Sequence, residues 1–289
     1  MWWNVNVINK LLMPLDQIDV DEYEDQMTFL EHLEALRWHL IRGIISIVIG
    51  AVFSFINGKY IFDSILLGST KNDFWTYQML CDLSHFIYDS DRICIEVMGF
   101  KLQALDIQEQ FYQHFMIAII GGLVLAMPYL LYEIYRFIKP ALKSSEKKYS
   151  FLVIGFSSSL FFSGVLFGYY ILSPISVNFL ANYSLSDSIE RNFKVSSVIN
   201  FISLLTLGAG IIFELPIVVY FLSKIGLLTA ETMKKYRRLA IIIILIISAV
   251  ITPPDVMSQI ILTFPILILY EIGIVIARKV SPKVPIEIP

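Results

Sequence analysis

A few acidic side chains interrupt long apolar stretches of this sequence, and their chemistry needs an explanation. Glu214 lies between an uncharged stretch that begins at Val195 and another that ends at Ser223, whereas Glu133 and Glu271 lie nearer the ends of similar stretches. A charge inside a membrane-spanning helix is costly, so it normally has a function or a partner. We interpret Glu214 as a proton-responsive or partner-binding acid. The alternative is a neutral carboxyl that only hydrogen-bonds within the protein. Glu133 and Glu271 fit the simpler interpretation of acids that reach the interface.

A second group of acids lies near basic residues in the sequence, at the ends of the apolar stretches. Glu31 and Glu34 precede the first stretch, and Glu146 lies in a lysine-rich segment after the second. A carboxylate can bind a guanidinium group through two parallel charge-assisted hydrogen bonds, which a lysine cannot reproduce. Taken alone, however, such acids are typical of a solvated surface.

The sequence has no signature of an enzyme. Zinc-protease, serine-hydrolase and phosphate-binding-loop motifs are absent. The four histidines are scattered, so we expect no metal site and no cofactor, and we interpret His32 and His39 as solvated interfacial residues. With 22 Lys and Arg against 25 Asp and Glu, no basic face indicates nucleic-acid binding.

The acids must be positioned by membrane-spanning helices, because 56% of the 289 residues are hydrophobic, only 16% are charged and the mean hydropathy is +0.69. A span needs about 20 mostly apolar residues. The sequence therefore predicts an all-α polytopic membrane protein with six spans, at about residues 36–56, 115–137, 151–172, 195–223, 239–254 and 256–277.

Two of these spans have features that predict local distortions. Pro216 removes a backbone donor just after Glu214, so we expect the fourth helix to bend there. We expect the fifth and sixth helices to be short and to thin the bilayer, with shielding by neighbouring helices as the alternative.

The distribution of Lys and Arg predicts the orientation. Most of them lie before the first span, after the second, after the fourth and after the sixth, so these segments and both termini should be cytoplasmic. Residues 1–27 form an acidic cytoplasmic arm that lacks the pattern of a cleavable signal, and Met27 is an alternative start. Residues 28–279 form the membrane domain, with an outer cap at 57–114, and residues 280–289 form a cytoplasmic tail.

Both cysteines, Cys81 and Cys94, fall in the predicted outer cap. If that side is oxidising, a disulfide between them is plausible, and two free thiols are the alternative.

Several segments resemble the TatC family, the multispanning subunit of the twin-arginine protein translocase. They are FLEHLEALR at 29–37, PYLLYEIYRFIKPAL at 128–142 with Glu146, FELP at 213–216, TPPDVMSQ at 252–259 and YEIG at 270–273. They occur in the family's order between about residues 28 and 279. The sequence is therefore identified as a member of that family.

The resemblance implies a concave six-helix bundle that recognises twin-arginine signal peptides and, with single-span TatA- and TatB-type partners, exports folded proteins using the proton-motive force. Self-association in a receptor complex is also implied. By motif, Phe137 and Glu146 match signal-peptide-binding positions, Glu214 matches the intramembrane acid, and Thr252 and Gln259 match positions where single-span partners dock.

Two positions depart from the family pattern. Ala35 stands where the family usually has Glu, so another acid must bind the second arginine; Glu31 lies one turn earlier on the same face and Glu34 is adjacent. The proline that the family has in the cap near Ile65 is also missing. An ion-coupled small-solute transporter that uses Glu214 and Glu271, or a passive membrane scaffold, remains an alternative.

Overall fold

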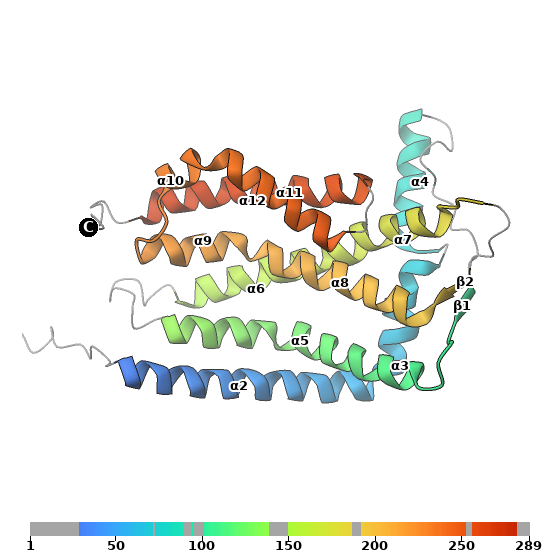
Figure 1. The fold of residues 1–289 in the computed structure, drawn as a ribbon, viewed down its shortest axis with the longest axis horizontal. Coiled ribbons are helices and arrows are strands. Elements are labelled where there is room, and N and C mark those ends of the chain that lie inside the picture. The colour runs from blue at the N-terminus through green and yellow to red at the C-terminus, as the bar shows by residue number, and fades with distance from the viewer. Residues whose placement is uncertain are drawn as a thin grey trace, which may run out of the picture.

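The computed structural model describes residues 29–71, 73–88, 94, 101–138, 150–186, 192–252 and 256–281. The long helices lie side by side (Figure 1): α2 (Phe29–Ile56) packs on α5 (Glu109–Ile138), α5 on α6 (Ser150–Phe167), and α6 on α8 (Val195–Phe213). Beyond them, α9 (Leu215–Lys224) packs on α12 (Val256–Val280), which also contacts α11 (Arg237–Ile251) and the short helix α10 (Ala230–Lys235).

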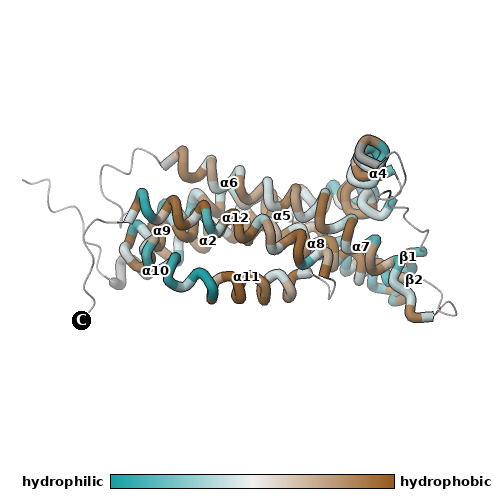
Figure 2. Tube along the Cα trace, turned by 90° about the horizontal axis from the view of Figure 1, so that it is seen from above, coloured by the Kyte–Doolittle hydropathy of each residue, from teal (hydrophilic) through white to brown (hydrophobic). Residues whose placement is uncertain are grey.

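The helices define two ends of the bundle. At the first, which we call the basic end, α2, α6 and α11 begin and α5, α9 and α12 end. At the opposite cap end lie α3 (Gly58–Tyr60), α4 (Trp75–Tyr88) and α7 (Ser173–Asn182), with β1 (Lys101–Gln103) paired in parallel to β2 (Asn192–Lys194). In Figure 1, α4 stands roughly perpendicular to the long helices beside their cap ends, and in Figure 2 it is seen end-on at one side of the bundle. These elements together form a cap at this end of the bundle.

Five segments are long and apolar enough to cross a membrane: Leu33–Ile56, Glu109–Ile138, Phe151–Asn182, Val195–Lys224 and Val256–Val280. Hydrophobic residues run along α11 as well, next to hydrophilic residues of α10 (Figure 2). Its 15 residues extend over about 22 Å at a rise of about 1.5 Å per residue, less than the hydrocarbon thickness of about 30 Å. The expected all-α membrane fold is confirmed.

The expectation of a short sixth helix is wrong. α12 has 25 residues and continues through Arg278 and Lys279 in its last turn. Basic side chains are favourable there because the last carbonyl groups of a helix carry partial negative charge. Of the last two helices, only α11 is short enough for us to expect thinning of the bilayer.

The fourth span is interrupted at the place where the sequence predicts a bend. α8 ends at Phe213, Glu214 forms a turn, and α9 begins at Leu215 with buried Pro216 in its first turn. The proline supplies no N–H group to continue the hydrogen-bond ladder, so the helix is interrupted at the acid.

α2 and α5 cross at two glycines. A Cβ atom added to Gly50 would lie 2.8 Å from the Gly122 carbonyl oxygen, and one added to Gly122 would lie 2.5 Å from the Ala51 backbone nitrogen. Close approach of two helix backbones requires such small residues. This crossing holds the amino-terminal helix directly against α5.

We expect Gly122→Ala to destabilise the protein by about 1–3 kcal/mol, the usual cost of overpacking, because only backbone atoms surround the added carbon. Gly155 is the matched control: it is exposed on α6, and a Cβ there meets nothing within 4 Å. Thermal unfolding in detergent should show a lower midpoint for Gly122→Ala and an equal or higher one for Gly155→Ala. Equal midpoints for the two variants would contradict this account of the crossing.

The cap is attached to the bundle through buried aromatic side chains. Phe74 and Tyr77 pack against Tyr169 and Tyr170. The Tyr77 hydroxyl lies 3.0 Å from the carbonyl oxygen of Ser69 and 3.1 Å from that of Pro174, and burial raises the pKa of this phenol. These contacts join α4 to the segment between α6 and α7.

Candidate functional site

Two of the four residues predicted to bind the signal peptide lie at the basic end within the described chain. Phe137 is half-buried in the last turn of α5, and Glu34 is exposed in the second turn of α2. The backbone of Glu31 lies in the first turn of α2, but its side chain is outside the description, as is the whole of Glu146. The site that the resemblance implies is therefore described only in part.

Sequence reasoning missed a cluster next to Phe137. Glu133 lies one turn before Phe137 on α5, where its side chain is 4% exposed. One carboxylate oxygen, Oε2, lies 2.5 Å from Nδ1 of His39 and 3.6 Å from Nη1 of Arg42, both on α2. The His39 ring also contacts the edge of Phe137, with ring centroids 6.0 Å apart.

Two interpretations of the sequence are corrected by this cluster. His39 is not a solvated interfacial residue, because its side chain is only 15% exposed and is bonded to Glu133. Glu133 does not extend into water, because its side chain is only 4% exposed and is bonded to His39 on α2. The spacing of four residues between Glu133 and Phe137 was the available signal, but the pairing with His39 depends on how α2 and α5 meet.

Glu214 is buried at the break between α8 and α9, at 6% exposure. Its Oε2 accepts a hydrogen bond of 2.5 Å from the Ser157 hydroxyl on α6, and its Oε1 has no partner within the part of the chain that the structure describes. Ten residues separate Glu214 from Lys224 at the end of α9, about 15 Å along a helix. The carboxyl group is therefore deep in the span, as the sequence predicts.

The third acid of the apolar stretches has a different environment. Glu271 is half-exposed at the basic end and accepts a 2.5 Å hydrogen bond from Nη2 of Arg237 on α11. An exposed ion pair of this kind contributes about 1 kcal/mol or less to the stability of the fold. Glu214 and Glu271 thus have separate partners.

The two residues matched to partner docking lie at the junction of α11 and α12 toward the cap end. Thr252 directly follows α11, and its buried hydroxyl donates to the Ser248 carbonyl oxygen at 2.8 Å. The Gln259 amide in the first turn of α12 donates to the Leu245 carbonyl oxygen at 3.2 Å. Both polar groups therefore bond within the α11–α12 pair.

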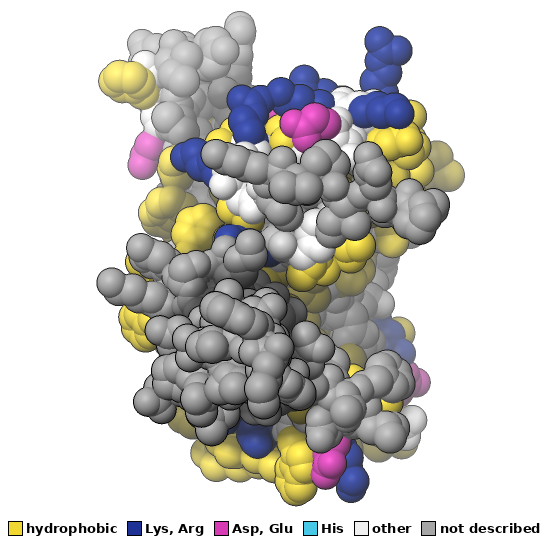
Figure 3. All heavy atoms as spheres, turned by 90° about the vertical axis from the view of Figure 1, so that its left-hand side faces the viewer, with side chains coloured by type: hydrophobic (Ala, Val, Ile, Leu, Met, Phe, Trp, Pro, Cys, Tyr) yellow, Lys and Arg dark blue, Asp and Glu magenta, His cyan; other side chains and the backbone are white. Residues whose placement is uncertain are grey.

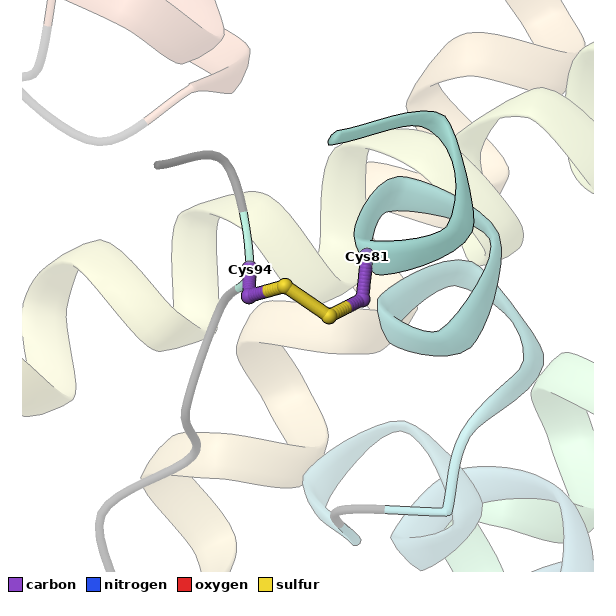
Figure 4. The surroundings of a disulfide bond; sticks show 2 residues. All are labelled: Cys81 and Cys94. Carbon is purple, nitrogen blue, oxygen red and sulfur yellow. A yellow bond between two sulfur atoms is a disulfide. The ribbon is translucent and has the colours of Figure 1, made fainter. Parts of the chain in front are cut away.

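The cap contains a disulfide between Cys81 on α4 and Cys94 (Figure 4), the pairing that the sequence made plausible. A ring nitrogen of His85 lies with the two sulfur atoms in a group spanning 4.8 Å, which the sequence analysis did not anticipate. Thiolates are the form of cysteine that binds metals. Sulfur atoms bonded to each other do not offer thiolates.

A further acid, Glu109, connects the cap to the bundle. Its Oε2 accepts from the Leu105 backbone nitrogen at 2.9 Å, and its Oε1 accepts from the Ser196 nitrogen at 2.8 Å. Beside it, Lys194 pairs with Asp106, and this hydrogen bond raises the pKa of the lysine. Glu109 therefore joins the start of α5 to the start of α8.

Lys and Arg side chains gather at the basic end. Figure 3 looks onto this end and shows them over α10 and the start of α11, with other parts covered by residues outside the description. The described basic residues here are Arg37, Arg42, Arg136, Lys224, Lys234, Lys235, Arg237, Arg238, Arg278 and Lys279. The long spans thus carry their basic flanks mainly at one end.

Comparison with known proteins identifies the family. The model of the Sec-independent protein translocase protein TatC matches residues 31–265. The TatC protein of Blattabacterium sp. subsp. Periplaneta americana is 38% identical over 90% of this chain and 98% of its own length. That of Carboxydothermus hydrogenoformans is 32% identical over 89% of this chain and 95% of its own length.

A comparison with solved structures identifies the same family. A crystal structure of the twin-arginine translocase receptor TatC in DDM has a TM-score of 0.68 at 32% identity, covering 86% of this chain and 99% of the other. The family is a protein translocase component and not an enzyme family. The chain is a multi-pass membrane protein that belongs to the TatC family of Sec-independent protein translocase proteins.

Proposed function

We propose that this protein recognises twin-arginine signal peptides at its basic end and takes part in the export of folded proteins across the cytoplasmic membrane. The observation that carries the proposal is the position of Phe137: it lies at the end of α5, beside the amino-terminal helix that bears Glu31 and Glu34. The two segments that match the family's recognition motifs thus converge at one end of the bundle.

The chemistry of this end suits a doubly basic ligand. Two arginines require at least two carboxylates, each able to accept a pair of parallel N–H···O bonds. Glu146, from the segment that follows Phe137, is the first of these in our proposal. The excess of Lys and Arg at this end predicts that it faces the cytoplasm, with both termini, so that precursors arrive there.

The remaining matched residues serve later steps in this proposal. Glu214, buried beside Ser157, is the acid that responds to the proton-motive force. Single-span TatA- and TatB-type partners dock at the α11–α12 junction. Because Thr252 and Gln259 bond within the pair, such a partner would pack on neighbouring apolar side chains, of which Val256 and Met257 are 70% and 64% exposed. Further copies of this chain join it in a receptor complex.

Peptide binding tests this function directly. The purified protein in lipid nanodiscs is mixed with a labelled twin-arginine signal peptide and, as the control, with the same peptide carrying two lysines. We expect at least about tenfold weaker binding of the lysine peptide, since two charge-assisted fork contacts are lost while the charge is kept. Co-purification of single-span proteins is the second readout. Equal affinities for the two peptides would refute the proposal.

The arrangement of the acids does not favour the alternative function of an ion-coupled solute transporter. It would use Glu214 and Glu271 together, but the first bonds to Ser157 and the second to Arg237. Family membership also favours translocation of proteins over that of small solutes.

A further inference from the structure

The proposed function leaves one buried acid unused. Glu133 is 3% exposed, about 8 Å along the helix from the end of α5. It shares a helix face with Phe137, because residues four apart are neighbours on a helix surface. It is therefore the buried carboxylate next to the aromatic residue matched to signal-peptide binding.

The hydrogen bonds of this carboxylate are incomplete. The two charged partners of Glu133 both contact the same oxygen, Oε2: His39 lies at 2.5 Å and the Arg42 guanidinium at 3.6 Å. Oε1 is buried and has no hydrogen-bond partner of good geometry in the described ranges, and the Tyr129 side chain interacts with the same carboxylate. A guanidinium in good geometry would instead approach both oxygens at about 2.7–2.9 Å. Arg42 thus fills half of a site that suits an arginine fork.

The Arg42 side chain in this half-filled site is partly exposed, unlike the acid that it pairs with. The Arg42 side chain is 39% exposed, whereas Glu133 is 4% exposed. Arg42 also lines a groove of about 550 Å³ between α2 and α5, with Ser46 and Tyr129 among the other lining residues. The space for an alternative position of this side chain is therefore next to it.

We propose that Glu133 is the second arginine-binding carboxylate of this protein, and that Arg42 occupies it until a signal peptide replaces the Arg42 guanidinium with its own. This inference rests on the proposed function and supplies the acid that Ala35 does not provide. Exchange of one guanidinium for another keeps the buried carboxylate paired throughout, which avoids the large cost of an isolated buried charge. The incoming arginine gains the bond to Oε1 that Arg42 lacks.

Two variants with opposite expected effects test the exchange. Glu133→Gln removes the acceptor, so the affinity for the twin-arginine peptide should fall by about tenfold or more. Arg42→Gln removes the guanidinium that competes with the peptide for Glu133. A larger fraction of the protein is then competent to bind, so the affinity for the peptide should rise severalfold. The matched controls are Glu271→Gln and Arg237→Gln, from the other Arg–Glu pair at the basic end, which should leave the affinity unchanged.

The direction of the Arg42→Gln effect decides the matter. A pair that merely clamps α2 to α5 would make both variants bind more weakly, and weaker or unchanged binding by Arg42→Gln overturns the inference even if Glu133→Gln fails to fold. The wild-type protein separates this failure from that of the proposed function. If it prefers the arginine peptide over the lysine peptide while Glu133→Gln binds as wild type, only the role of Glu133 is lost.

Discussion

Replacing Glu146 with Gln abolishes export of a twin-arginine reporter, while the protein still inserts into the membrane. The substitution keeps the size of the side chain but removes its charge, so one charge-assisted contact to an arginine is lost. Such a contact contributes about 1.5–3 kcal/mol, equivalent to about ten- to a hundredfold in affinity. A receptor that binds its ligand this much more weakly should fail at the first step of export.

The measurement is the amount of folded reporter found outside the cytoplasm, with membrane fractionation to verify insertion of the variant. Glu231→Gln is the matched control, because this exposed glutamate on α10 lies at the same end and its loss changes the net charge equally. We expect normal export with the control. Normal export with Glu146→Gln would remove Glu146 from the site.

Replacing Glu214 with Ala stops transport at a later step, with signal-peptide binding retained. The carboxyl group is buried about 15 Å from the end of α9 and bonds only to Ser157 among the described residues. A buried acid with one free oxygen is suited to take up or release a proton as its surroundings change. Alanine removes this capacity and leaves the Ser157 hydroxyl without its acceptor.

Transport is measured in inside-out vesicles under a monitored proton gradient, alongside peptide binding by the same protein. We expect a loss of at least about tenfold in transport and binding within error of wild type. Ser157→Ala serves as the control for the hydrogen bond, since it leaves the acid in place. Unchanged transport by Glu214→Ala would eliminate the proposed role.

The positions of the spans follow from the sequence because a charge-free run is a local property. The run from Val195 is interrupted at Glu214 and Pro216, and the structure shows a helix interrupted at the same place. The third span was underestimated: the helical path that begins at Phe151 continues to Asn182 instead of ending at Leu172. Hydropathy alone does not locate the end of a helix that continues into a cap.

The surroundings of the acids could not be predicted in the same way. His39 and Glu133 are 94 residues apart in sequence, and their contact depends on the close crossing of α2 and α5 at Gly50 and Gly122. Likewise, Glu109 bonds to the Ser196 backbone nitrogen, 87 residues away, and this contact depends on the starts of α5 and α8 lying side by side. Glu214 was singled out from sequence because it interrupts an apolar stretch, and Phe137 because its motif resembles a family; neither signal requires a contact to be known.

The shortness of α11 has a consequence for how the chain enters its membrane during synthesis. A helix of about 22 Å does not by itself match the lipid it must partition into, and only Ile244 and Ser248 of α11 are buried by the rest of the protein. The Gln259 amide of the next helix supplies a partner for the Leu245 carbonyl group. Stable integration of α11 should therefore wait until α12 has left the ribosome, so that the two settle into the bilayer as one hairpin.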